Sequence, residues 1–323
     1  MRKLLFAAIL IGTSAFAVQA RAADKIRFGY TVQVHQANMM IIQDYAKEHG
    51  LEIEITPMRR YADLQLALMT NQVDIAAMGY VNVGLMQEKN FADYRAIAGV
   101  FNGGQSLVLA KGVKASSWKD LEGLKLGTAP NSYAELLFKT SAKLGGADLS
   151  KITTVSFAAG GPPALSALKN REIDGFVFWE PNPADAAVQD IGYYSSLDIG
   201  ANPARHINGV MLVNSGFLKD KRAAVLGIIK AHIDATNALN SDSAKYEQVA
   251  IKGTGSTAAI VTTAIPHGSL DYRLHAKEAK ALLKMIHEAK ITSEDTSVAV
   301  DKQFDYSVLM EATGKPRNEL GGE

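Results

Sequence analysis

The hydrophobic positions in residues 25–78 change between a period of two and a period near 3.6, which is typical of alternating strands and helices. Gly50 supplies a stop signal for the first helix. Strands joined by helical crossovers usually run in the same direction, so the pattern predicts a mostly parallel sheet. The expected elements are strands at residues 25–30, 51–55 and 74–78, with helices at residues 37–49 and 62–70 between them.

A second set of elements follows in the same order, with strands expected at residues 124–128, 152–156 and 175–178 and helices at residues 132–144 and 163–169. Residues 67–74 (ALMTNQVD) align without a gap on residues 167–174 (ALKNREID), at an offset of 100 residues. Upstream, residues 26–29 (IRFG) match residues 124–127 (LKLG). Two matched segments in the same order favour duplicated lobes, with a fold of generic repeated α/β units as the alternative.

The remainder of the chain predicts one more strand and a mainly helical tail. The strand is expected at residues 208–213, and the helices at residues 221–240, 244–251 and 275–290. No third sheet is expected, so the tail should return to the first lobe. This division gives an α/β fold with two mostly parallel sheets flanked by helices and a cleft between two lobes: lobe I from residues 23–110 and 206–323, lobe II from residues 111–205.

The N-terminus has the pattern of a secretory signal peptide over residues 1–22. Basic residues 2–3 precede an apolar run over residues 4–18, and Ala20 and Ala22 are small residues at cleavage-determining positions. The run is shorter than the roughly 20 residues that span a bilayer as a helix. A buried first helix is the alternative, but it should show one polar face, which this run lacks. We therefore expect export to the periplasm and cleavage after Ala22.

Composition narrows the function classes. The chain has no cysteine, so it offers no disulfide, thiolate ligand, cysteine nucleophile or lipidated cysteine. Its formal net charge is +1 and its Lys and Arg residues are scattered, which gives no electrostatic footprint for nucleic acid or for an acidic membrane. We expect a freely diffusing, non-lipidated monomer.

Several segments carry a resemblance to a known family. They are Ala67-Leu68 through Asp74 with Gly79 after it, residues 118–127 (WKDLEGLKLG), residues 167–175 (ALKNREIDG) and residues 179–181 (WEP). In this order they resemble type II periplasmic binding proteins of the nitrate, sulfonate, taurine and thiamine-pyrimidine-precursor group. The resemblance covers nearly all of the mature chain. It implies the two-lobed type II periplasmic-binding-protein fold, capture of a small ligand, and delivery to the permease of an ABC importer.

The expected binding site lies between the lobes. In open α/β sheets, ligands bind beyond the carboxyl ends of the strands, where helices direct unpaired N–H groups at them. The residues at these positions are polar, aromatic or glycine. The expected ligand-binding residues are Thr31, Gln33, Gln36, Gly79, Tyr80, Asn102 and Gly103 in lobe I, and Asn131, Ser132, Tyr133, Gly160, Gly161, Trp179 and Glu180 in lobe II.

Each of these residues has a structural alternative. Ser132 with Glu135 forms a capping box, the glycines could serve turns alone, and the two glutamines could be solvated. Trp179 is the expected aromatic anchor, with a core tryptophan as the alternative. Glu180 either faces the ligand or is a partner inside lobe II, and the sequence leaves this open.

Enzyme classes are not supported. The sequence has no G-x-S-x-G or H-E-x-x-H motif, and its seven histidines lack metal-ligand spacing. Residues 253–258 (GTGSTA) match a dinucleotide fingerprint in letters only, because they lie between expected helices. Pyrimidine-synthesising proteins of the resembled superfamily use a cysteine-rich motif, which this chain cannot provide. We expect no catalytic residue, no metal and no cofactor; a sensory binding protein and a periplasmic enzyme are the alternatives.

Overall fold

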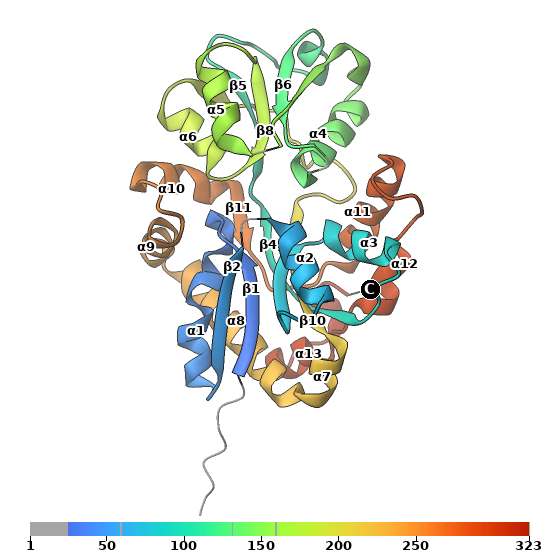
Figure 1. Cartoon of the computed structure of the whole chain (residues 1–323). Coiled ribbons are helices and arrows are strands. Elements are labelled where there is room, and N and C mark those ends of the chain that lie inside the picture. The colour runs from blue at the N-terminus through green and yellow to red at the C-terminus, as the bar shows by residue number, and fades with distance from the viewer. Residues whose placement is uncertain (1–24, 59, 131, 159, 323) are drawn as a thin grey trace, which may run out of the picture.

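The computed structural model describes residues 25–58, 60–130, 132–158 and 160–322. The expected signal peptide, residues 1–22, lies outside the described residues. The chain forms two sheets, one above the other in Figure 1, with helices on both faces of each. We call the part built on the six-stranded sheet lobe I and the part built on the five-stranded sheet lobe II.

The sheet of lobe I is mixed. Its strand order is β11-β4-β10-β3-β1-β2. β1 pairs in parallel with β2 and β3, whereas β10 runs antiparallel to β3 and β4, and β11 runs antiparallel to β4. The strands are β1 Lys25–Thr31, β2 Glu52–Met58, β3 Ile75–Gly79, β4 Tyr94–Gly103, β10 Ile207–Asn214 and β11 Gly268–Leu270.

The sheet of lobe II is mixed in the same way, with the order β7-β6-β8-β5-β9. β6 pairs in parallel with β7 and β8, and β5 runs antiparallel to β8 and β9. The strands are β5 Gln105–Ala110, β6 Lys125–Thr128, β7 Thr153–Ser156, β8 Gly175–Trp179 and β9 Gly192–Tyr194. The prediction of mostly parallel sheets therefore holds for the strands joined by helices, whereas β5 and β10, which follow the crossings between the lobes, and β11 run the other way.

The chain crosses between the sheets at Gly103 and Gly104, which connect β4 to β5 without a helix. Both glycines have positive φ angles, of 75° and 79°. The predicted boundary near Lys111 lies one strand too late, because β5 already pairs with β8 and β9. β5 is buried along its whole length and shows no alternation, so its sheet could not be assigned from the pattern.

The helices cover both faces of each sheet (Figure 1). In lobe I, α1 packs against α8 and α9, and α3 packs against α11 and α12. In lobe II, α4 contacts β8 and β5, and α5 packs against α6 and β8. The helices are α1 Ala37–Glu48, α2 Tyr61–Met69, α3 Val81–Glu88, α4 Tyr133–Leu144, α5 Gly161–Lys169, α6 Asn182–Val188, α7 Ser215–Asp220, α8 Arg222–Ser241, α9 Ser243–Thr254, α10 Ala258–Ala264, α11 Ala276–Glu288, α12 Val298–Gln303 and α13 Ser307–Thr313.

The sequence repeat corresponds to a repeated local structure. Asp74 accepts a hydrogen bond from the backbone N–H of Arg27 at 2.9 Å, and Asp174 accepts one from that of Lys125 at 2.7 Å. In return, the backbone N–H of each aspartate donates to the carbonyl of the same partner, at 2.8 Å in both lobes. The aligned aspartates thus fix the start of β1 and the start of β6 in the same way.

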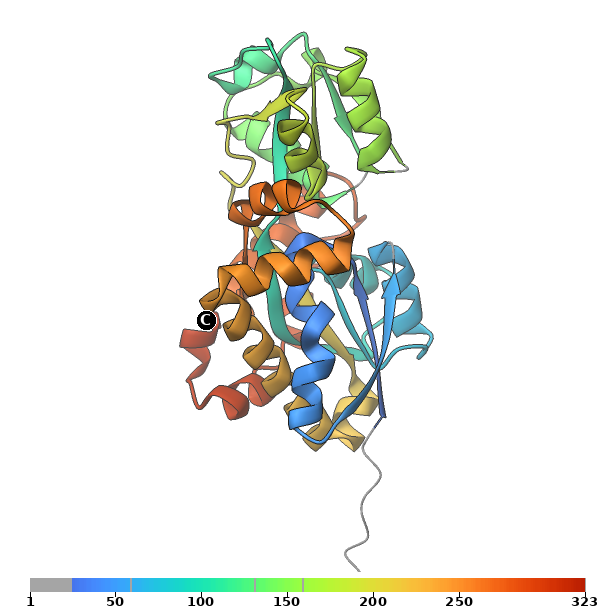
Figure 2. The same ribbon diagram turned by 90° about the vertical axis from the view of Figure 1, so that its left-hand side faces the viewer.

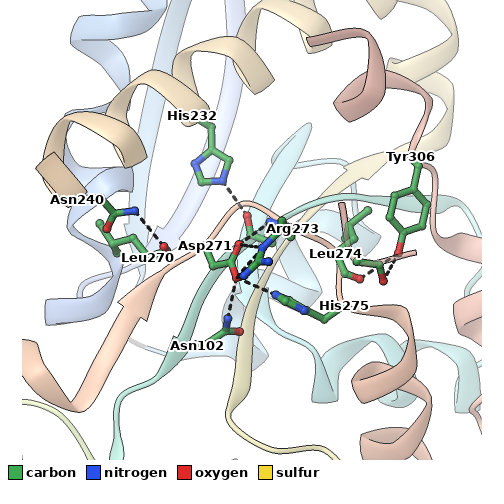
Figure 3. A network of polar contacts seen from close by, with 11 residues as sticks. Asn102, His232, Asn240, Leu270, Asp271, Arg273, Leu274, His275 and Tyr306 are labelled. Atoms are coloured by element: carbon green, nitrogen blue, oxygen red, sulfur yellow. Dashed lines mark hydrogen bonds and ion pairs between the residues drawn. The ribbon is translucent and has the colours of Figure 1, made fainter. Parts of the chain in front are cut away.

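A polar network fixes the segment between β11 and α11 on β4 (Figure 3). The Asp271 carboxylate accepts from Arg273 Nε at 3.0 Å and from Asn102 Nδ2 at 3.2 Å, and it pairs with His275 Nε2 at 2.8 Å. Beside it, buried His232 lies 2.7 Å from the Gly99 carbonyl. The tail therefore forms part of lobe I.

The lobes also touch away from the crossing strands. α10 of lobe I contacts α6 of lobe II, and the two helices lie next to each other in Figures 1 and 2. The GTGSTA segment ends α9, forms the turn at residues 255–257 and begins α10, with Gly255 in the left-handed conformation at φ 70°. The segment thus connects two helices and does not follow a strand, as a dinucleotide-binding motif would.

Candidate functional site

The carboxyl ends of the helix-connected strands in both lobes lie at the crossing between them. In lobe I, Gly79 at the end of β3 pairs with Gly209, near the start of β10 where the chain returns. In lobe II, Trp179 at the end of β8 pairs with Gln105, directly after the crossing. The exits of β1, β3, β6 and β8 therefore meet between the lobes. We call the polar and aromatic residues at these exits the interlobe site.

In lobe I, three expected residues converge at the exit of β1. The Thr31 hydroxyl accepts from Gln33 Nε2 at 3.1 Å and from Gln36 Nε2 at 2.9 Å. Gln36 Nε2 also donates to the Tyr61 hydroxyl at 2.8 Å. Gln36 is fully buried, and its Oε1 has no hydrogen-bond partner among the described residues. A buried carbonyl oxygen without a donor is costly, so this atom is suited to receive a donor from a ligand.

Tyr61 was not predicted to belong to the site. It is the first residue of α2, and burial raises the pKa of its hydroxyl to about 12, so the group is a neutral donor at physiological pH. The ring lies against Gly79, where an added Cβ would be 3.2 Å from Tyr61 Cε2. The exit of β2 was not considered as a site loop, although an aromatic residue follows that strand as one does at other exits.

In lobe II, the helix expected after β6 begins as predicted. The Ser132 hydroxyl accepts from the Glu135 backbone N–H at 3.2 Å and caps α4. The Glu135 carboxylate accepts from Thr128 Oγ1 at 3.1 Å and pairs with Lys139 at 2.8 Å. Ser132 therefore has at least its structural role. Asn131 lies outside the described residues.

Tyr133 connects the two lobes. It is the first residue of α4, and its hydroxyl donates to the carbonyl of Ile207, the first residue of β10. Burial raises the pKa of this hydroxyl, so it remains a neutral donor. The hydroxyl that was expected to contact a ligand is thus occupied by the backbone of the crossing segment.

The exits of β7 and β8 bring four residues together. Gly160 has a φ of 97°, and an added Cβ there would lie 3.7 Å from Trp179 Cζ2. Gly161 leaves no space for a side chain, because a Cβ would lie 2.0 Å from the Asn182 amide. Asn182, which was not predicted, donates from Nδ2 to the Trp179 carbonyl at 2.9 Å. Both glycines thus permit close packing beside the Trp179 ring, which also contacts Phe178 edge-on at 5.3 Å.

Three expected residues of lobe I lie elsewhere. Tyr80 is 1% exposed and packs in lobe I beside Phe304, at 6.0 Å between ring centroids. Asn102 donates to Asp271, as described above, and Gly103 lies on the crossing strand itself. A side chain at Gly103 would meet the His267 carbonyl at 2.7 Å.

Glu180 is directed into lobe II. Its carboxyl accepts from the backbone N–H of Ala184 at 3.1 Å and from the Tyr194 hydroxyl at 2.8 Å, and the residue is 1% exposed. Burial raises its pKa to about 8, so the group is mostly protonated and neutral at pH 7. Of the two alternatives that the sequence left open, the geometry corresponds to the internal partner.

Charged groups near the interlobe site are paired with neighbours. Arg60, the residue before α2, forms a bidentate pair with Asp63 at 2.7 and 3.1 Å. In the part of the chain that the structure describes, no group of three His, Asp or Glu residues could hold a metal ion. The described site residues offer neutral amides, hydroxyls and an aromatic ring, a combination suited to binding a small polar molecule.

Comparison with known proteins agrees with this architecture. Residues 19–252 match the model of the NMT1-like family. No curated protein sequence matches the chain significantly. Among the helices of the described residues, none has both the length and the apolar character needed to cross a membrane.

Several solved structures have the same fold at low sequence identity. The ligand-binding component of an ABC-type import system from Staphylococcus aureus, solved with zinc bound, has a TM-score of 0.75 and 15% identity, covering 90% of this chain and 99% of that chain. The periplasmic aliphatic sulphonate-binding protein SsuA from Escherichia coli has a TM-score of 0.74 and 15% identity, covering 86% and 91%. The periplasmic nitrate-binding protein NrtA from Synechocystis PCC 6803 has a TM-score of 0.74 and 13% identity, covering 92% and 91%.

The family match extends over more than half of the chain, and the solved structures share its two-lobed α/β fold. The protein therefore belongs to the NMT1-like family, and its fold is that of periplasmic binding proteins.

Proposed function

We propose that this protein is exported to the periplasm, captures a small organic solute in the interlobe site, and delivers it to the permease of an ABC importer. The observation that carries the proposal is the cluster at the exit of β1, where Gln36 keeps a buried, unpartnered oxygen beside Thr31 and Tyr61. A buried oxygen without a donor destabilises an empty site, and a ligand that donates a hydrogen bond to it removes this cost. The folds of sulphonate- and nitrate-binding proteins support the same role.

The proposed solute is a sulfonate- or carboxylate-type anion or a heterocycle. Burying a ring of about 150 Å² at about 25 cal/mol per Å² contributes roughly 4 kcal/mol, whereas micromolar binding needs roughly 8 kcal/mol. Contact with Trp179 alone is therefore insufficient, and the neutral donors at the strand exits must provide the remainder. Helix N-termini and hydroxyls can hold an anion without a cationic side chain, and the free oxygen of Gln36 would favour a ligand that also carries a donor.

A thermal-shift screen of residues 23–323 tests the proposal. The panel contains sulfonates, nitrate, aromatic carboxylates, ureas and pyrimidines at millimolar concentration. A ligand at 100 times its Kd stabilises the folded protein by about 2.7 kcal/mol, which is readily detected. Recovery of the hit unchanged by mass spectrometry supports capture without chemistry. Consumption of the hit during incubation would instead indicate an enzyme.

Substitution of the two tryptophans locates the site. Trp179→Ala should raise the Kd of the hit at least about tenfold, because truncating a buried aromatic anchor removes a large part of the binding energy. Trp118→Ala is the matched control, because Trp118 is the other tryptophan of the chain. It packs in lobe II against Phe138, with 6.4 Å between the ring centroids. It should lower the melting temperature and leave the Kd unchanged. An unchanged Kd for Trp179→Ala would remove that ring from the site.

A further inference from the structure

A cavity lies at the crossing between the lobes, apart from the residues of the interlobe site. It has a volume of about 420 Å³. Its walls are residues of the crossing strand between 102 and 107, residues 194–199 after β9, His206, and residues 266–269 at the start of β11. We call this cavity the hinge pocket. Its size is in the range of small-molecule sites.

Strand order places the hinge pocket on the other side of the crossing strand from the interlobe site. In lobe I, β11 pairs with the edge of β4 that faces away from β3 and β1. In lobe II, β9 pairs with the edge of β5 that faces away from β8 and β6. The pocket is lined from the β11 and β9 sides, whereas the interlobe site is built at the exits of β1, β3, β6 and β8. The two sites therefore have different lining residues.

The hinge pocket contains a buried polar group without a partner. Gln105 is the first residue of β5 and lines the pocket, and the residue is 8% exposed. Its Oε1 is buried and has no hydrogen-bond partner among the described residues. An orphaned acceptor costs about 1–3 kcal/mol, and a ligand that donates a hydrogen bond relieves this cost. Ser106, also buried, lines the pocket beside it.

The lining carries few charged groups. Asp198 pairs with His206 at 2.9 Å, and the lining residues include no lysine or arginine. His267 stacks on Tyr194, with 3.7 Å between ring centroids, and burial lowers its pKa, so it is neutral at pH 7. The lining therefore offers an anion no lysine or arginine, and its one carboxylate already has a hydrogen-bond partner in His206. The lining favours a neutral molecule with several hydrogen-bonding groups.

Both lobes contribute walls to the pocket. Residues 194–199 end and follow β9 of lobe II, whereas residues 266–269 precede and begin β11 of lobe I. Any rotation of the lobes about the crossing strand moves these walls relative to each other. A ligand that binds one arrangement better than another shifts the equilibrium between them, and by linkage it changes the affinity of the interlobe site.

From these observations we propose that the hinge pocket is a second binding site, for a neutral small molecule rich in hydroxyl or amide groups, and that its occupancy modulates capture of the solute. The modulation rests on the proposed solute-binding function, whereas the binding itself does not. The two can therefore fail separately.

The test measures binding of two probes, xylitol as a polyol and nicotinamide as an amide, to residues 23–323 by ligand-observed NMR and calorimetry. At least one probe should bind at millimolar concentration or better. Gln105→Met, which keeps the side-chain size and removes the amide, should weaken that binding at least about tenfold. Gln36→Met is the matched control in the interlobe site and should leave probe binding unchanged. Absence of binding by both probes, or equal binding to Gln105→Met, would overturn the proposal.

A second variant protects the test against misfolding of Gln105→Met. Ser196 is exposed at the rim of the pocket, so Ser196→Trp should fold and obstruct the cavity. It should abolish probe binding at an unchanged melting temperature; retained binding would mean that the probe binds elsewhere. In the wild type, saturating probe should change the Kd of an interlobe ligand at least about threefold, and in Ser196→Trp it should not. An equal Kd with and without bound probe would reject the coupling between the two sites, while the hinge pocket would remain a binding site.

Discussion

Two buried histidines and one buried glutamate have pKa values shifted far from their ordinary ones. His35 lies 3.1 Å from the Ile265 carbonyl, and His232 lies 2.7 Å from the Gly99 carbonyl. Burial lowers the pKa of each to about 4, whereas burial raises the pKa of Glu180 to about 8. All three groups are therefore mostly neutral at pH 7 in the folded chain.

These pKa values predict a stability maximum near pH 6.5. Below the ordinary histidine pKa of about 6.5, His35 and His232 are protonated in the unfolded state but stay neutral in the folded state. Unfolding therefore takes up protons, and stability falls as the pH falls towards 4. Glu180 acts in the opposite sense: unfolding releases its proton between about 4.5 and 8, so stability falls as the pH rises through that range. Each proton that is taken up or released on unfolding changes the free energy of unfolding by about 1.4 kcal/mol per pH unit. The free energy of unfolding should therefore fall by up to about 1.4 kcal/mol per pH unit on either side of pH 6.5.

Urea unfolding between pH 5 and 8 checks this prediction. Glu180→Gln keeps a neutral, hydrogen-bonding side chain and should level the decline between pH 6.5 and 8. A wild-type stability that keeps rising to pH 8 would contradict the assigned protonation state of Glu180.

Residue types at strand exits indicated much of the interlobe site, but neighbours decided which side chains belong there. Thr31, Gln33 and Gln36 converge at one exit, as do Gly160, Gly161 and Trp179 at another. The Glu180 side chain points into lobe II because its carboxyl accepts hydrogen bonds from two donors there. Tyr61 and Asn182 were missed because their positions follow from packing against Gly79 and Gly161.

At the scale of elements, the aligned aspartates of the two repeat copies contribute unequally to the stability of the fold. Asp74 is buried and also forms a bidentate pair with Arg27, at 2.5 and 3.0 Å. Asp174 is less buried and accepts from the backbone of Lys125. Charge-assisted hydrogen bonds are roughly twice as strong as neutral ones.

Replacing each aspartate by alanine should therefore give unequal losses in the free energy of unfolding. We expect about 2–3 kcal/mol for Asp74→Ala and about 1 kcal/mol for Asp174→Ala, measured by urea unfolding. Asp44→Ala, at an exposed helix position with a weak contact to Lys47 at 4.0 Å, is the control and should cost under about 0.5 kcal/mol. Equal losses in the two repeats would show that the pair with Arg27 contributes nothing.

The longer elements were predictable because their periodicity is strong. β1, β6, α1 and α4 begin and end within about two residues of the expected bounds. β9 and β11 have three residues each, too few to establish a period, and they form because β5 and β4 present open edges to them. The sequence likewise did not predict α10, because a helix of 7 residues is too short to show a clear helical period.

At the scale of the whole molecule, Tyr133 forms a hydrogen bond between α4 of lobe II and Ile207 of the crossing segment. Tyr133→Phe should raise the Kd of an interlobe ligand about fivefold, because a net loss of about 1 kcal/mol disfavours the arrangement of the lobes seen here. Small-angle scattering of the unliganded variant should show a larger radius of gyration than the wild type.

Tyr193→Phe is the matched control. The Tyr193 hydroxyl donates to the Val113 carbonyl at 2.8 Å, a bond of the same kind within lobe II. This variant should leave both the Kd and the scattering curve unchanged. If both variants behave alike, the bond from Tyr133 has no special role in holding the lobes together.

The sequence by itself determined the alternation of strands and helices, the duplication of the strand-helix units and the strand exits at which the candidate site residues gather. These features depend on local periodicity and on residue types at fixed positions, which each segment carries alone. Only the tertiary structure decided the crossing at Gly103 and Gly104, the antiparallel strands β5 and β10, the inward turn of Glu180 and the hinge pocket. The reason is physical: strand direction, burial of a charge and enclosure of a cavity depend on contacts between segments far apart in the chain.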